Sequence, residues 1–189
     1  IYKSIRKKFL ILCFLWTGTR AAFNGISLSS KSFPGNFYFN IIILYIIESI
    51  ATYISGVLIN IKKLGRKGTL WILYFIIVVT FLILASTTIN VYGELSLNFV
   101  ARFCACAIDI IYFTYSIELY PTPVRSFAFG INASFGNGGS IIAPFLLEFL
   151  QNWLFLTIFA VVCGLNALII IPLPETCGKP MIETIKELE

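Results

Sequence analysis

Six long apolar runs separated by short polar breaks constrain this chain more than any other feature. A helix needs about 20 mostly apolar residues to cross the hydrocarbon core of a bilayer. On that rule, the sequence predicts six membrane spans. They lie near residues 9–29, 38–61, 69–90, 93–118, 126–148 and 152–172. The expected fold is therefore an all-α membrane protein with six transmembrane helices in one unit, ending in a polar tail at 173–189.

The composition agrees with lipid as the surrounding medium. Hydrophobic residues make up 58% of the chain and charged residues only 12%, whereas a soluble domain carries roughly 25% charged residues. The chain cannot cover itself with polar surface. Its net charge of +5 would suit nucleic acid only if a basic face alternated with aromatic side chains, and no such face occurs. We therefore expect a lipid bilayer, and no nucleic acid, as a partner.

The basic residues gather in the breaks that would lie on one side of the bilayer. The opposite breaks hold only Lys31. Positive residues mark the cytoplasmic side, or the matrix-like side of an organelle. An even number of spans then places both termini on that side, in a plasma or organelle membrane. The clustered residues are Lys3, Arg6, Lys7, Lys8, Lys62, Lys63, Arg66, Lys67, Arg125, Lys179 and Lys186.

Chemistry-bearing residues are scarce. The chain has no histidine, and its five cysteines form no CxxC pair. Four of the cysteines lie inside apolar runs, where we interpret them as small buried hydrophobic residues. No paired carboxylates, nucleophile triad or metal-ligand cluster can be recognised. The sequence therefore predicts no enzyme activity, no metal and no cofactor.

Polar and ionisable residues inside the apolar runs are costly in lipid, so each is a functional candidate. Arg20 and Asn24 lie one helical turn apart on the first span. Glu48 lies within the second span. Arg102 and Asp109 lie two turns apart on the fourth span, so they share a face and could bracket a polar path. Arg102 and Asp109 could instead brace helices as a structural pair, and Glu48 could pair with basic residues near the inner face.

The fifth span is unusually rich in small and polar residues. Small residues let neighbouring backbones come close, and a proline frees a carbonyl one turn earlier. A half-broken helix near the middle of the membrane is where transporters place ligands. Packing alone is the other interpretation, and both stay open. The residues are Asn132, Ser134, Gly136, Asn137, Gly138, Gly139, Ser140 and Pro144.

A charged elbow at 118–125 separates the fourth and fifth spans. Pro121 and Pro123 stop a helix, because proline lacks an N–H and pushes the preceding residue away from helical angles. Glu118 ends one run and Arg125 begins the next. We expect these two side chains to pair across the turn, which makes the elbow a candidate hinge.

Several short motifs follow one another along nearly the whole chain. They are Ile5-Arg6-Lys7, Trp16, Phe23-Asn24-Gly25, Gly35-Asn36-Phe37-Tyr38, Gly65-Arg66-Lys67, Glu118-Leu119-Tyr120-Pro121-Thr122 with Arg125, Ile141-Ile142-Ala143-Pro144-Phe145 and Leu173-Pro174-Glu175-Thr176 with Gly178, Pro180 and Thr184. In this order and spacing, the motifs resemble the C-terminal half of organic cation, organic anion and carnitine transporters of the major facilitator superfamily. The elbow is the most specific part of the resemblance.

This resemblance implies a six-helix half of a major facilitator fold, equivalent to its helices 7–12. Asn137 stands where cation carriers usually have Asp and anion carriers usually have Arg, and Lys62 or Asn60 replaces the acid usual before Gly-Arg-Lys. From this resemblance and from the intramembrane position of Asp109, the residues predicted to bind substrate are Trp16, Phe23, Asn24, Glu48, Arg102, Asp109 and Asn137. Those implied to form the inner gate are Gly65, Arg66, Lys67, Glu118 and Arg125.

Two functions remain in competition. The first is transport of small organic solutes (organic cation, anion or carnitine-like) by alternating access, with an N-terminal six-helix half in the same polypeptide or a separate chain. The second is a transport-inactive, transporter-derived subunit among other membrane subunits of a larger complex. The start at Ile1 rather than Met suggests a piece of a longer polypeptide, and the altered charge motif suggests the structural role.

Overall fold

Six helices occur in the part of the chain that the structure describes. The computed structural model describes residues 2–29, 36–61, 64–86 and 90–179, and no strand occurs in these ranges. The predicted all-α fold is confirmed. The helices are α1 (Tyr2–Ser29), α2 (Phe37–Leu58), α3 (Gly65–Ser86), α4 (Val91–Leu119), α5 (Arg125–Phe149) and α6 (Asn152–Ile170).

Five of these helices are long and apolar enough to cross a membrane, and α5 is the exception. Helix α5 has 25 residues, which is ample length for a bilayer. Its Gly, Asn and Ser residues dilute the apolar ones, so its composition does not match that of a lipid-surrounded helix. Part of this polar and small-residue content is buried, as at Asn132, Gly136 and Gly139, on the side that packs against α1.

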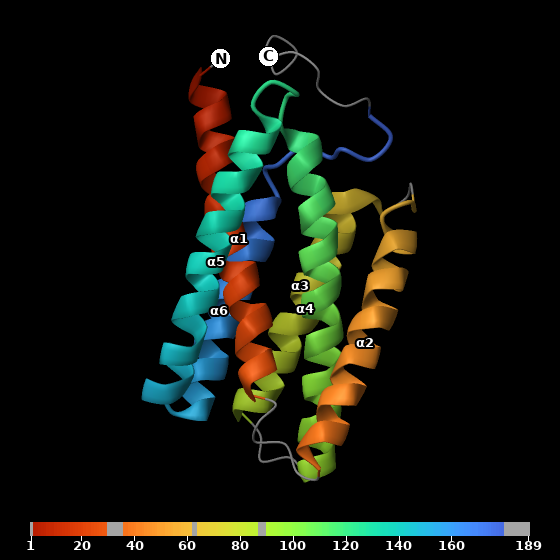
Figure 1. Cartoon of the computed structure of the whole chain (residues 1–189), viewed down its shortest axis with the longest axis vertical. Helices are drawn as coiled ribbons and strands as arrows, with labels where there is room; N and C mark the ends of the chain where they lie inside the picture. The colour runs from red at the N-terminus through yellow and green to blue at the C-terminus, as the bar shows by residue number, and fades with distance from the viewer. Residues whose placement is uncertain (1, 30–35, 62–63, 87–89, 180–189) are drawn as a thin grey trace.

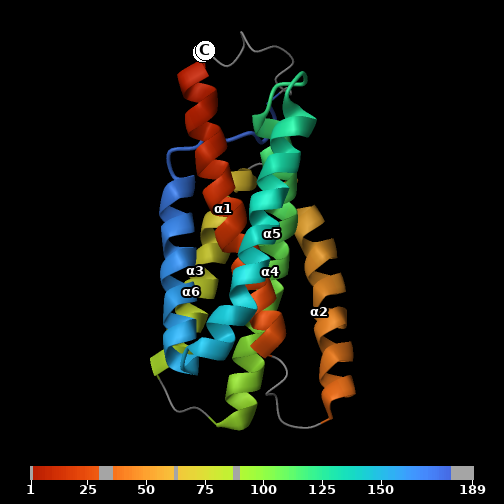
Figure 2. The same ribbon diagram turned by 60° about the vertical axis from the view of Figure 1, so that its left-hand side comes forward.

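Helices α1 and α4 form the centre of the bundle (Figures 1 and 2). Helix α5 packs mainly on α1, α3 packs on α6 and on α4, and α2 packs on α4. The burial follows this arrangement, since 56% of the apolar window of α4 is buried but only 17% of that of α2. Figure 2 shows α2 standing at the side of the bundle. The start of α1 and the segment after α6 lie at the same end (Figure 1).

Local chemistry explains where several helices begin and end. Asn36 starts α2 by accepting a hydrogen bond from the Tyr38 N–H at 3.0 Å, as an N-cap residue does. Tyr120 ends α4 in an extended conformation (φ −102°, ψ 137°), which the following Pro121 imposes. The predicted stop at the elbow is therefore found in the structure.

Helix α3 begins earlier than the predicted span. We expected a basic break at 62–68, yet α3 starts at Gly65, so Arg66 and Lys67 lie in its first turn. Helix α4 likewise begins at Val91, two residues before the predicted span. Four stretches of these predictions lie outside the described residues: 31–35 and 62–63 of the breaks, 87–89 of the third span and 180–189 of the tail.

The seam between α1 and α5 brings two backbones close together. A Cβ on Gly139 would collide with the backbone carbonyl of Thr17, and a Cβ on Gly136 would lie 3.0 Å from the side chains of Trp16 and Arg20. Close helix contact through small residues is a common way to stabilise helix pairs in lipid. Packing is therefore one function of these two glycines.

This seam yields a stability prediction. Gly139→Ala should destabilise the protein by about 1–3 kcal/mol, because the added methyl has no space against α1. Gly138→Ala is the matched control, since no atom lies within 4 Å of its Cβ position and alanine favours a helix by about 1 kcal/mol. Thermal unfolding in detergent measures both variants. Equal shifts in melting temperature for the two variants would contradict the close packing of Gly139 against α1.

Candidate functional site

Three ion pairs join the helices of the bundle within the described residues, and α4 contributes one partner to each. Its Arg102, Asp109 and Glu118 pair respectively with α2, α1 and α3. The three α4 residues are seven and nine positions apart, so the pairs lie at three depths along the bundle. Helix α4 therefore links three neighbouring helices through charge.

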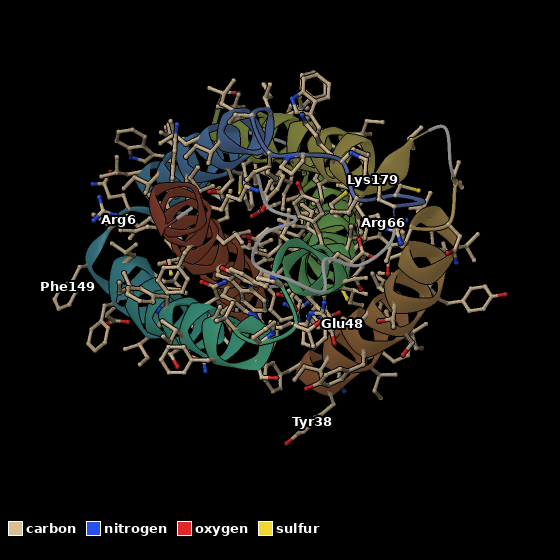
Figure 3. The ribbon with its side chains drawn as sticks, turned by 90° about the horizontal axis from the view of Figure 1, so that it is seen from above. Arg6, Tyr38, Glu48, Arg66, Phe149 and Lys179 are labelled. Carbon is tan, nitrogen blue, oxygen red and sulfur yellow. The ribbon has the colours of Figure 1, made fainter. Side chains whose placement is uncertain are left out.

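The first pair is deeply placed and joins three helices. The Arg102 side chain is only 6% exposed, and its Nη2 donates to Oε1 of Glu48. Its Nη1 donates to the carbonyl of Phe23 at 2.9 Å, and the guanidinium carbon lies 3.9 Å from the centroid of the Phe23 ring. Figure 3 shows Glu48 between α2 and α4, while Tyr38 on the same helix points outward. The predicted residues Phe23, Glu48 and Arg102 thus form one cluster.

The second pair joins α1 and α4. Arg20 Nε lies 2.9 Å from Asp109 Oδ1, and the side chains are 31% and 18% exposed. The atoms are not aligned as a hydrogen bond, so the contact is ionic. The Arg20 guanidinium also lies 5.4 Å from the centre of the Trp16 ring. Arg102 and Asp109 are therefore not a pair with each other, because each has its own partner.

The remaining predicted binding residues occupy different environments. Trp16 is only 1% exposed, and its Nε1 donates to Ser116 Oγ at 3.0 Å, so its ring supports Arg20 from inside the bundle. Asn24 is half-buried and donates to Ser140 Oγ at 2.9 Å. Asn137 is exposed on α5. Within the described part of the chain, no hydrogen bond or ion pair joins Asn137 to the charged cluster.

The third pair lies at the end of the bundle that holds the start of α1. Arg66 Nη2 lies 2.9 Å from Glu118 Oε1, and Arg66 Nη1 donates to the carbonyl of Ile59 at 3.2 Å. The expected partner of Glu118 was Arg125, and that prediction is corrected here. Arg125 Nε instead donates to the carbonyl of Tyr120 at 3.1 Å, because the proline turn brings that carbonyl within reach.

Glu175 completes this end of the bundle, and sequence reasoning did not include it among the site residues. Its Oε1 accepts the backbone N–H of Arg66 at 2.9 Å, and its Oε2 accepts that of Lys67 at 3.0 Å. The first N–H groups of a helix have no partner within the helix, and a carboxylate is the favoured group there. Two features of the sequence could have indicated this contact. The first turn of α3 has no acidic residue of its own, and an acidic residue, Glu175, follows the last span.

Gly65 makes this contact possible. Its φ is +66°, a left-handed conformation that glycine adopts without strain. A Cβ at this position would come within 2.5 Å of the Glu175 carboxylate. Lys67 Nζ also donates to the carbonyl of Ile171. We call the set Gly65, Arg66, Lys67, Glu118 and Glu175 the tail clamp, because it ties α3 and α4 to the segment after α6.

Two opposing effects set the pKa of Glu175. Burial raises the pKa of this carboxyl group. Backbone N–H groups of Cys177, Arg66, Lys67 and Thr176 donate to the ionised form and lower the pKa by more, so the net shift is below the ordinary value of 4.5. The charged form of Glu175 is therefore the one that the folded chain stabilises.

Comparison with known proteins identifies the family to which this chain belongs. A family model described as sugar (and other) transporter matches residues 23–188. The chain belongs to this transporter family. Its fold is that of half a major facilitator protein, since it superposes on the xylose transporter XylE from E. coli in an inward-open conformation with a TM-score of 0.73. That match has 14% sequence identity and covers 91% of this chain and 49% of XylE.

Several relatives of this chain belong to solute carrier family 22. Member 15 of Xenopus tropicalis is 31% identical, with 97% of this chain and 36% of the relative covered. Member 16 of Homo sapiens is 29% identical, with 97% and 32% covered, and member 3 of Rattus norvegicus is 29% identical, with 98% and 34% covered. The chain spans about a third of the length of these relatives. The predicted resemblance is confirmed.

The tail clamp yields a pH prediction. Because the pKa of Glu175 is lowered on folding, its stabilising effect is complete above about pH 4.5 and is lost as the pH falls through the lower folded-state pKa. Glu175→Gln should therefore lower the melting temperature at about pH 7 and have a smaller effect at about pH 3. The measurement is the difference in melting temperature between the parent protein and the variant across this range.

Glu148→Gln is the control for this experiment, since Glu148 is an exposed glutamate outside the clamp. A difference between the parent protein and Glu175→Gln that is constant from neutral to acid pH would contradict the role given to the Glu175 charge.

Proposed function

We propose that this chain forms the C-terminal half of a membrane carrier that moves small organic solutes by alternating access. The observation that carries the proposal is the set of three ion pairs along α4. Ionisable groups within membrane helices are rare, and they usually mark solute paths or moving contacts. A purely structural subunit could pack the same helices without them, so the pairs favour the carrier over the transport-inactive alternative.

Helix α5 supports the existence of an opposing half. Its buried side faces α1, while Ser134 and Asn137 are exposed. Exposure of these polar groups to hydrocarbon would be unfavourable. An aqueous cavity shared with an N-terminal six-helix half would solvate them. In this proposal, Asn137 faces the cavity, and the second half belongs to the same polypeptide or to a separate chain.

The solute would bind along the wall formed by the two deeper pairs. Arg20 with Asp109, and Arg102 with Glu48, each sum to zero charge, and Asn137 adds none. A solute with a net charge would therefore find no uncompensated partner in this half. The geometry thus supports a solute that is neutral or carries both charges over an obligate cation or anion.

The tail clamp supports an inner gate. Described basic side chains at this end include Arg6, Lys7, Lys8, Arg66, Lys67, Arg125 and Lys179. By the positive-inside rule, this end would face the cytoplasm or the matrix-like side of an organelle. The clamp would hold the inner ends of α3 and α4 together, and its rearrangement would accompany opening to that side. Gly65, Glu118 and Arg125 would serve the same gate.

Introducing charge at Asn137 tests the cavity. Asn137→Asp should raise the ratio of cation to anion uptake by on the order of tenfold, and Asn137→Arg should shift it the opposite way, because a fixed charge in a partly buried cavity attracts the opposite charge. Uptake of labelled cations, anions and zwitterions by cells producing the full polypeptide measures the ratio. Asn137→Ser is the uncharged control. An unchanged ratio of cation to anion uptake in both charged variants would show that Asn137 does not line the cavity.

Charge reversal tests the gate. Arg66→Glu and Glu118→Arg should each reduce uptake by about tenfold or more, and the double variant should recover part of it, since the pair is restored with reversed polarity. Lys179→Glu reverses a charge at the same end outside the clamp and is the control. Surface abundance is measured in parallel. Strictly additive losses in the double variant would show that Arg66 and Glu118 do not act as a pair.

A further inference from the structure

A cavity of about 200 Å³ lies between α1, α2 and α4 at the end of the bundle opposite the tail clamp. Ser27 from the last turn of α1 and Phe37 from the first turn of α2 border it, and Arg102 of α4 contributes its polar side. The rest of the wall consists of Leu28 of α1 and of Ile41, Leu44 and Tyr45 of α2. The cavity thus lies between the Arg102–Glu48 pair and the end of the bundle where α1 ends and α2 begins.

The size of the cavity limits what it can hold. Pockets for drug-sized ligands have volumes of about 300–1,000 Å³, so this one suits something smaller. At about 30 Å³ for each water, the space equals that of roughly seven waters. A single ring with one polar substituent is of this size.

The chemistry of the lining defines the polar substituent. A guanidinium has five N–H donors, and Arg102 uses two of its nitrogens on the Phe23 carbonyl and on Glu48. It therefore has more donors than these two acceptors engage. A ligand oxygen that accepts a hydrogen bond complements it, while Ile41, Leu44 and Phe37 offer an apolar surface to the ring.

The charge of the lining defines the charge of the ligand. Glu48 neutralises Arg102 at contact distance, so an anion approaching Arg102 meets the negative charge of Glu48 as well. A cation meets the positive charge of Arg102, which lines the cavity, whereas Glu48 is not among the lining residues. An uncharged ligand encounters neither penalty and leaves the ion pair intact.

We propose that this cavity is a binding site for a small uncharged aromatic or cyclic molecule that presents an oxygen acceptor to Arg102. The cavity shares Arg102 with the wall proposed for the transported solute, but Arg20 and Asp109 do not line it. Binding in the cavity goes beyond the proposed transport function and does not rest on it. Binding here needs no transport cycle, so it is measured at equilibrium.

Three probes of the same shape test the charge rule: benzamide, benzoate and benzylammonium. Each is titrated into the purified full polypeptide in lipid nanodiscs, and binding is followed by saturation-transfer NMR. Benzamide binds saturably, with a dissociation constant on the order of 1 mM for so small a ligand. Benzoate and benzylammonium bind at least about tenfold more weakly. Absence of saturable benzamide binding, or tighter binding of either ion, overturns the proposal.

A matched pair of variants locates the bound probe. Ile41→Trp fills the cavity and weakens benzamide binding by about tenfold or more, while Ile42→Trp adds the same side chain at a 54% exposed position outside the cavity and leaves binding unchanged. Arg102→Lys keeps the charge but removes the planar donor group, and weakens binding without reversing the order of the three probes. Equal binding by the Ile41 and Ile42 variants overturns the assignment even if uptake of every solute proceeds normally.

Discussion

The pairing of charges along α4 is the constraint on which the rest of this structure depends. In a medium without water, an ionised side chain must have a partner, and removing one member of a buried pair typically costs about 3–5 kcal/mol. Helix α4 presents Arg102, Asp109 and Glu118 to three different neighbours. The positions of α1, α2 and α3 around it are therefore fixed by electrostatics as well as by apolar packing, which in lipid gains little from the hydrophobic effect.

The bundle divides into a firmly packed part and a loosely covered one. Helices α1 and α5 share hydrogen bonds and close backbone contacts, as in the Asn24–Ser140 bond and the approach of Gly139 to Thr17. Helix α2 has large aromatic side chains such as Tyr53 in the open, at 77% exposure. Buried Leu44, Ala51 and Ser55 pack it in the bundle, and Glu48 adds its ion pair to α4. A change at that single pair would consequently act on the placement of a whole helix.

Hydrophobic runs and proline rules were enough to predict the six helices and the stop at Tyr120, because these depend on local composition. The partners of the charged residues were not predictable in the same way. Glu118 was assigned to Arg125, seven residues away, but it meets Arg66, which is 52 residues away. The early start of α3 was missed for the same reason, since the carboxylate that caps it lies 109 residues later. Local rules define elements, whereas ion pairs depend on how the elements pack.

The contact between Glu175 and the start of α3 also has a consequence for how the protein is made. The ribosome produces Gly65, Arg66 and Lys67 more than a hundred residues before Glu175. Until Glu175 has been synthesised, the N–H groups in the first turn of α3 lack their carboxylate acceptor. Water or lipid headgroups at the membrane surface accept these hydrogen bonds in the meantime. The final arrangement of a helix in the middle of the chain is thus completed only after the last helix has been inserted, so the order of assembly differs from the order of translation.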